Sequence, residues 1–93
     1  MIRTFADKRT AALFAGRLTR SLPADVQTRA RLKLMLVDAA AVLDDLRSPP
    51  GNRLEALKGD RKSQHSIRVN EQWRICFVWR DGGAWDVELV DYH

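Results

Sequence analysis

Cysteine is nearly absent from this chain of 93 residues, and no long apolar run occurs in it. The one cysteine, Cys76, cannot form a disulfide within the chain, which favours a reducing compartment. The first twelve residues carry Arg3, Lys8 and Arg9 with no apolar block behind them, so we expect no secretory signal. No stretch is long enough to span a membrane. We therefore expect a cytoplasmic protein without a membrane partner.

Recognisable metal and cofactor motifs are also lacking. The two histidines, His65 and His93, and the cysteine stand at unrelated spacings, which gives no zinc pattern. No glycine-rich phosphate loop of the P-loop or dinucleotide type occurs. Cys76 falls within a predicted strand, where a buried structural thiol is a simpler interpretation than a nucleophile. We expect no metal site and no cofactor.

Positive charge is concentrated in the middle of the chain. The net charge is +4, and residues 47–80 hold eight Lys or Arg against three acids, a local balance of 8 − 3 = +5. The last thirteen residues hold four acids and no Lys or Arg. A basic segment with aromatic neighbours is typical of proteins that bind RNA or DNA, although a solvated face explains it equally well.

Helical spacing dominates the first half. Residues 2–5 suit a short strand, Asp7 suits an N-cap, and the first helix is expected to end near Gly16. Pro23 is expected to open a second helix. The apolar stripe of that helix is Val26, Ala30, Leu34, Val37 and Ala41. Leu32 and Leu36 widen it, so this helix is expected to be packed on more than one side.

Alternating patterns dominate the second half. Residues 47–52, with two prolines and a glycine, divide the halves, and residues 54–57 suit a short strand or turn. Apolar residues alternate through 66–70, 73–79 and 85–89, with a turn at 81–83. Trp85, Val87 and Leu89 are expected on one face. The sequence predicts a single α+β domain over residues 1–93, with two N-terminal helices packed on one face of a small antiparallel sheet.

The alternation also predicts what the other sheet face carries. If Ile67 and Val69 face the helices, Arg68 and Asn70 face away from them. By the same argument Arg74 points opposite to Ile75, and Tyr92 opposite to Leu89. The uncovered face would then carry arginines, an amide and a tyrosine.

Such a face contains the groups needed to cleave RNA. The ribose 2′-hydroxyl would attack the adjacent phosphorus while Arg68 and Arg74 clamp the phosphate. His93 titrates near neutral pH and could serve as acid or base, and Asp91 could orient it or accept a proton. Tyr92 could stack on a base or position a proton. Each of these residues also has a purely structural explanation, such as a frayed terminus for His93.

Several sequence blocks together resemble a known family. They are Leu57-Lys58-Gly59-Asp60-Arg61, Ser66-Ile67-Arg68, Trp73-Arg74-Ile75 and the terminal Asp91-Tyr92-His93. The combination strongly resembles HigB toxins, a branch of the RelE superfamily that includes killer or plasmid-maintenance proteins. The close match covers about the C-terminal half. Glu55 stands where some relatives carry a histidine, and Ser63 where the family commonly has glycine.

The resemblance implies a RelE-like fold and ribosome-dependent, metal-independent cleavage of messenger RNA. It implies neutralisation by a HigA-type antitoxin with a helix-turn-helix fold, and operator binding only by the toxin–antitoxin complex. It assigns catalysis to Asp91, Tyr92 and His93, with Arg68, Asn70 and Arg74 on the sheet. RNA or ribosome contacts fall to Arg53, Lys58, Arg61, Lys62 and Asn70.

Two other functions remain open. The same basic face could bind RNA or the ribosome without cutting. A DNA-binding regulator acting alone is disfavoured, because no helix-turn-helix pattern is visible. The first helix, with Lys8, Arg9, Phe14 and Arg17, is either an antitoxin surface or ordinary cover for the sheet.

Overall fold

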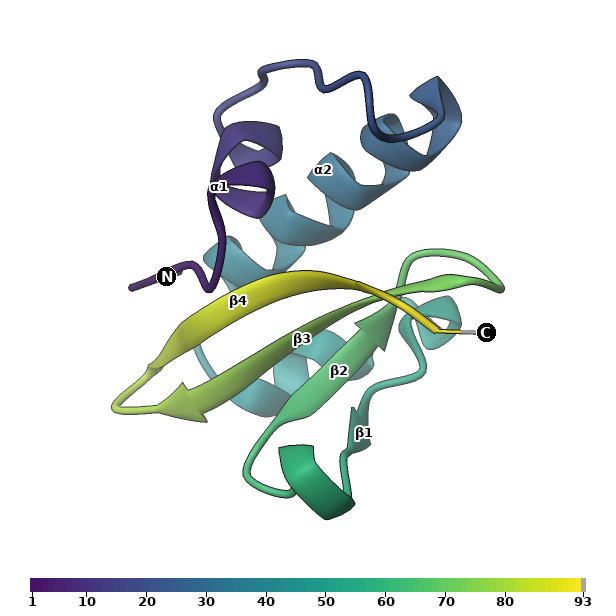
Figure 1. Ribbon diagram of the computed structural model, residues 1–93. Coiled ribbons are helices and arrows are strands. Elements are labelled where there is room, and N and C mark those ends of the chain that lie inside the picture. The colour runs from purple at the N-terminus through teal and green to yellow at the C-terminus, as the bar shows by residue number, and fades with distance from the viewer. Residues whose placement is uncertain (93) are drawn as a thin grey trace.

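A computed structural model describes residues 1–92, so the predicted site residue His93 lies outside the described residues. Two α-helices come first, α1 (Lys8–Phe14) and α2 (Ala24–Ala39), followed by two 3-10 turns, η1 (Leu43–Arg47) and η2 (Pro50–Asn52). The strands are β1 (Glu55–Ala56), β2 (His65–Arg68), β3 (Trp73–Arg80) and β4 (Gly83–Asp91), with the turn η3 (Gly59–Arg61) between β1 and β2. Figure 1 shows both α-helices on one side of the strands.

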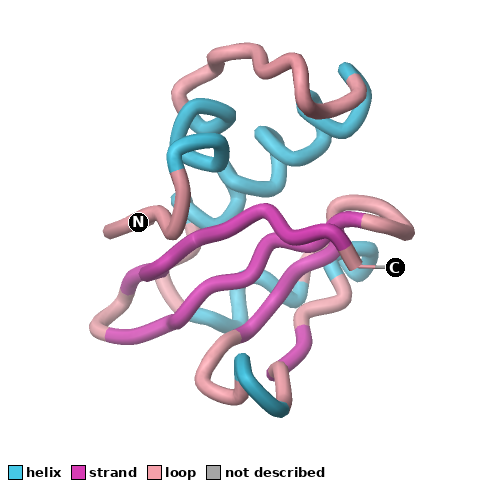
Figure 2. Tube along the Cα trace, viewed as in Figure 1, coloured by secondary structure: helices cyan, strands magenta, loops and turns pink. Residues whose placement is uncertain are grey.

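The strands form one antiparallel sheet in the order β1-β2-β3-β4. This confirms the predicted α+β class. Figure 2 shows the four strands side by side, with the short turn η3 lying apart from the α-helices. Residues 2–5 do not form a regular strand, because only Ile2 and Phe5 make isolated parallel bridges, to Ala84 and Val87 of β4.

The boundaries of both helices follow local chemistry. The Asp7 carboxylate accepts a hydrogen bond from the Thr10 backbone N–H at 2.7 Å, which is the predicted N-cap. α1 ends at Phe14, and Gly16 takes a left-handed conformation with φ +85°. Pro23 precedes the first residue of α2 as its N-cap.

One hydrophobic core joins the helices to the sheet. Its α2 members, Val26, Ala30, Leu34 and Val37, are almost fully buried. The strands contribute Ile67, Ile75, Phe77, Val87 and Leu89, and the adjacent Val69 is also buried. At the helix end the predicted stripe is wrong by one residue: α2 stops at Ala39, and Ala40 is buried rather than Ala41.

Two packing predictions are wrong. Leu32 and Leu36 are exposed, so within this chain α2 is covered on its inner side only. Trp85 does not share a face with Val87 and Leu89. A bulge shifts the β3–β4 register between Cys76 and Val78, and Asp86 has φ +54°, which turns Trp85 to the opposite face.

Candidate active site

The strand register brings several predicted site residues onto one face. Arg68 pairs with Arg74 and Ser66 pairs with Cys76, while Cys76 also pairs with Glu88 of β4. Directly paired residues of antiparallel strands project to the same side, which here is opposite to Ile67 and Ile75 of the core. We call this side the open face. Its residues are Glu55, Ser66, Arg68, Arg74, Cys76, Glu88 and Tyr92.

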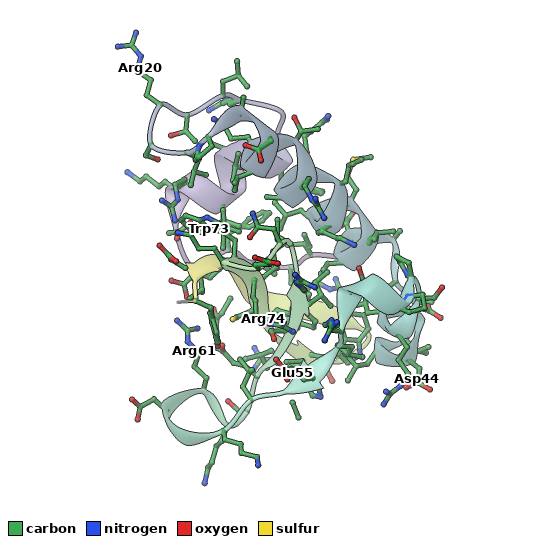
Figure 3. All side chains as sticks on the ribbon, turned by 90° about the vertical axis from the view of Figure 1, so that its right-hand side faces the viewer. Arg20, Asp44, Glu55, Arg61, Trp73 and Arg74 are labelled. Atoms are coloured by element: carbon green, nitrogen blue, oxygen red, sulfur yellow. The ribbon has the colours of Figure 1, made fainter. Side chains whose placement is uncertain are left out.

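Arg74 is the most firmly held residue of the open face. Its side chain is only 11% exposed. The guanidinium donates to the Ser66 hydroxyl at 2.8 Å and to the backbone carbonyl of Arg53 at 2.8 Å. It also lies 3.1 Å from the carboxylate of Glu55, which is 57% exposed. Figure 3 shows Arg74 and Glu55 close together beside β1. This network fixes the positive charge of Arg74 in one position.

Tyr92 lies over the buried thiol of Cys76. The phenol oxygen is 3.9 Å from Sγ, while Tyr92 as a whole remains 36% exposed. Burial raises the pKa of Tyr92, and the neighbouring Cys76 adds to the increase. Burial likewise raises the pKa of the Cys76 thiol. Tyr92 is therefore a protonated hydrogen-bond donor at neutral pH, and Cys76 is a neutral structural thiol, as predicted.

Arg61 reaches the open face from η3. Its guanidinium donates to the Glu88 carboxylate at 3.2 Å and to the Gln64 side chain at 2.9 Å. Partial burial lowers the pKa of Arg61, but the hydrogen bond to Glu88 and nearby acidic groups outweigh this, so the pKa lies above its usual value. The charge of Arg61 acts on both Cys76 and Tyr92. In Figure 3 Arg61 extends from η3 back toward the strands.

Arg68 and Asn70 lie toward the turn between β2 and β3. Arg68 is half-buried, and the described part of the chain gives its guanidinium no hydrogen-bond acceptor. Asn70 follows the end of β2, and its side-chain oxygen accepts from the backbone N–H groups of Gln72 and Trp73 at 2.8 Å each. Asn70 therefore holds a turn, and both residues line a polar hollow with Arg29 of α2.

Asp91 does not share the open face with Tyr92. It pairs with Trp73, and two residues further along β3 Ile75 pairs with Leu89. Asp91 therefore has the same orientation as the core residue Leu89 and projects to the core side at the end of β4. Its carboxylate accepts from the side chain of Gln72 at 3.2 Å. The structure thus separates two of the predicted catalytic residues, Asp91 and Tyr92, onto opposite faces.

The remaining basic residues lie around the edge of the sheet. Lys58 and Lys62 are exposed and flank η3 as its N-cap and C-cap residues. Arg53 is exposed and left-handed, with φ 47°, and its carbonyl receives the hydrogen bond from Arg74. Arg9 of α1 is not an exposed contact residue, since its guanidinium covers Trp73 at 5.4 Å and donates to the Leu89 carbonyl.

Glu55, Ser66 and Glu88 belong to this site but were missing from the sequence-based set of site residues. Ser66 is two residues before Arg68 in the same strand, so the alternation of side chains could have placed it on the same face. Glu88 is brought next to Cys76 by the register of β3 with β4, and Glu55 is brought next to Ser66 by the register of β1 with β2. Neither placement can be read from the local sequence. Within residues 1–92, no group of three or more His, Cys, Asp and Glu side chains is arranged to hold a metal ion. The helices of the same range include none with the length and apolarity of a membrane span.

Comparison with known proteins decides the family. A family model described as the RelE-like toxin HigB of type II toxin–antitoxin systems matches residues 3–93. The chain belongs to the HigB-like toxins. This confirms the resemblance found in the sequence, and it extends the match to the N-terminal half.

Two relatives support the assignment of this HigB-like toxin. Toxin HigB-1 of Vibrio cholerae is 46% identical over 70 residues, which is 75% of this chain and 74% of that protein. A Proteus vulgaris protein named Endoribonuclease HigB is 34% identical over 93 residues, the full length of both chains. The second name agrees with the predicted endoribonuclease.

A solved structure supports the fold of this HigB-like toxin. A chain of the YoeB–YefM complex from Staphylococcus aureus aligns with a TM-score of 0.62 at 13% identity. The alignment covers 100% of this chain and 98% of the other. At this identity the likeness establishes the RelE-like fold alone.

Proposed function

We propose that this HigB-like toxin is a ribosome-dependent, metal-independent endoribonuclease that cleaves messenger RNA in the cytoplasm. The observation that carries the proposal is the arrangement of the open face. Three chain segments bring Arg61, Arg74 and Tyr92 together there, around the buried Cys76. Two fixed positive charges beside a protonated phenol suit the chemistry of a phosphodiester.

The proposed reaction uses the RNA's own nucleophile. The ribose 2′-oxygen forms a bond to the adjacent phosphorus and loses its proton to a base of the enzyme. The bond from phosphorus to the 5′-oxygen breaks, and that oxygen takes a proton from an acid of the enzyme. The products are a 2′,3′-cyclic phosphate and a free 5′-hydroxyl. Guanidinium groups stabilise the additional negative charge on the phosphate oxygens.

Roles within the open face follow from the contacts. Arg74, already hydrogen-bonded in place, presents a preorganised charge, whereas Arg68 can move to clamp a phosphate. Tyr92 donates a hydrogen bond, which fits its raised pKa. His93 is proposed as the acid or base, with Asp91 orienting the end of the chain. Glu55 is a further candidate proton acceptor, because its carboxylate is exposed beside Arg74.

The proposed dependence on the ribosome follows from the kinds of acid–base groups that the open face carries. The residues named for the open face include no histidine, so we expect free RNA to be a poor substrate. Ribosomal RNA would hold the messenger in line for attack, which can contribute a large part of the rate. Arg53, Lys58, Arg61 and Lys62, with Asn70, are proposed to contact the messenger or the ribosome, since most of them are exposed around η3 and β1.

The proposed partner that neutralises the toxin is a HigA-type antitoxin with a helix-turn-helix fold. Operator DNA would be bound only by the complex of the two proteins. The helices of this chain support that division of roles. α1 has seven residues, α2 has sixteen, and residues 15–23 separate them, whereas a helix-turn-helix joins its helices by a turn of about three to four residues.

The deciding experiment is inducible expression followed by mapping of messenger 5′ ends. New ends inside translated regions are expected with the wild-type chain, and they should disappear in Tyr92→Ala and His93→Ala, which keep Arg68 and Arg74. If growth arrest persists in both variants without new ends, the chain binds RNA or the ribosome without cutting. Efficient cleavage of naked RNA would contradict the dependence on the ribosome.

A further inference from the structure

The outer side of α2 carries large apolar side chains that no other described residue buries. Five large hydrophobic residues are exposed on α2 or beside it: Leu18, Leu32, Met35, Leu36 and Val42. Leu18 is 89% exposed and Leu32 is 57% exposed. Leu32 and Leu36 are one helical turn apart, and Met35 lies beside them. This is the second apolar side of α2 that the sequence pattern predicts should be packed.

Two hollows join along this side of the molecule. The first lies between the end of α1 and α2 and is lined by Leu13, Leu18 and Leu32, among others. The second is lined by Leu32, Leu36 and Pro49 together with basic residues. Because Leu32 lines both, the two hollows adjoin, and we call them together the α2 groove. Leu32 and Leu36 place most of it on the outer side of α2, although Arg29 also borders the polar hollow beside Arg68.

Every charged residue that lines the α2 groove is basic. Arg17 and Arg31 line the first hollow, and Arg29 and Lys33 line the second. Burial, and then the charge of Arg29, lower the pKa of Lys33, so positive charges are crowded here. A ligand that carries carboxylates would relieve this repulsion.

The loop that forms one wall of the groove is held in place. The Gln27 side chain accepts from the Thr19 N–H at 2.9 Å and donates to the carbonyls of Thr19 and Leu22 at 2.7 and 2.8 Å. Gln27 itself is buried. Leu18 is therefore presented to solvent by a braced loop, and binding there requires little ordering of the chain.

We propose that the α2 groove binds the antitoxin through a segment that carries large aliphatic side chains flanked by aspartate or glutamate. This inference rests on the proposed pairing with an antitoxin. A second copy of this chain fits the groove poorly, since it would bring two sets of the same four basic residues together. The apolar floor provides the buried contact, and the basic rim selects an acidic partner.

Titration of the purified toxin with the product of the neighbouring gene tests the proposal. A Tyr92→Phe background allows the toxin to be produced. We expect Leu32→Glu and Leu36→Glu each to raise the Kd by about tenfold or more. Arg31→Glu should raise the Kd and reduce its dependence on salt. Arg47→Glu, an equal charge change at an exposed position of η1 outside the groove, should leave the Kd within about twofold.

Further measurements exclude other occupants. A Kd unchanged in both leucine variants, with their thermal unfolding unchanged, overturns the proposal. A dimer of the toxin alone that Leu36→Glu abolishes would assign the groove to a second copy instead. Binding of the toxin alone to anionic vesicles, lost in Leu36→Glu while the antitoxin Kd is unchanged, would assign it to a membrane surface.

Growth assays in the active background separate this inference from the nuclease. Leu36→Glu should still arrest growth, but coexpressed antitoxin should no longer restore it. If the wild-type chain does not arrest growth, the proposed nuclease fails, whereas the titration still decides the groove.

Discussion

The guanidinium of Arg74 on β3 lies 3.1 Å from the carboxylate of Glu55 on the edge strand β1, on the other side of β2. The positive charge that we propose to stabilise a phosphate is therefore already paired with a negative one. The pair is asymmetric, because Arg74 is nearly buried while Glu55 is mostly exposed. An incoming phosphate can displace the exposed carboxylate without moving the arginine. Arg74 consequently has a structural role in addition to its proposed chemical one.

Arg74→Ala is expected to destabilise the fold, and Arg68→Ala is not. Removing Arg74 leaves the Ser66 hydroxyl and the Arg53 carbonyl without their donor, at a cost of about 2–4 kcal/mol in free energy of unfolding. Arg68 is half-buried without such contacts, so its loss should change stability by less than about 1 kcal/mol. Urea unfolding of both variants measures the difference. Equal stabilities would contradict the structural role of Arg74.

Tyr92→Phe is expected to reduce cleavage by about 10²- to 10⁴-fold, the usual contribution of a positioned proton donor. The phenol oxygen contacts Sγ of Cys76 only at 3.9 Å, so stability should change little. Cleavage on programmed ribosomes, measured beside thermal unfolding, tests both statements. Phe keeps the ring, so full activity in this variant would assign Tyr92 to stacking rather than to proton positioning.

Asn52→Ala is expected to cost about 2–3 kcal/mol of stability, because it removes a fully buried amide. The Asn52 side chain donates to the carbonyls of Leu46 and Ser48 at 3.2 Å and accepts from Lys33 at 2.6 Å. It thus ties the segment that leads into β1 and Glu55 to α2. Asn70→Ala, which removes an amide from an exposed turn, is the control and should cost about 1 kcal/mol or less.

Stability is expected to fall at alkaline pH. Burial raises the folded-state pKa of Cys76 above its ordinary value of 9.0, and burial also raises that of Tyr92 above its ordinary value of 10.0. The folded state therefore holds these protons more tightly. The resulting stability is fully present below the unfolded pKa values and is lost as pH rises through the folded ones.

Urea unfolding at about pH 7 and about pH 10 measures this loss. Cys76→Ala should lose less stability between these two pH values than the wild type, and Cys76→Ala with Tyr92→Phe should lose least. A steeper loss in the double variant would show that other groups govern the alkaline limb.

Local chemistry made much of the fold predictable. The Asp7 cap, the helix end near Gly16 and the turn at residues 81–83 each depend on a side chain or a positive φ that acts over a few residues. The alternation around Ile67 and Ile75 was sufficient to place Arg68 and Arg74 on the same face of the sheet. Asp91 has the same parity as Leu89, so the same pattern already placed it away from Tyr92.

The features that the sequence could not provide depend on distant partners. The bulge at Asp86 turns Trp85 away from the core, and no local signal marks it, because Asp takes a glycine-like conformation there. The contact of Glu55 with Arg74 requires the register of β1, a strand of two residues. The apolar pattern of Leu32 and Leu36 shows that these residues favour burial, but not whether the cover comes from this chain or another.

The N-terminal segment has a consequence for how any partner can approach. Arg3 and Ala6 donate to Ala84 and Val87 of β4, and Thr10 accepts from the Leu89 N–H. At Ala84, Val87 and Leu89 the backbone groups on the outer edge of β4 are thereby already hydrogen-bonded. The edge strand at the other end of the sheet, β1, has only two residues available for pairing. Another protein cannot add a strand to this sheet beside β4 unless it first displaces residues 1–10 from that edge. Recognition of the toxin along this edge is thus left to side chains, whose identity a cognate antitoxin can distinguish.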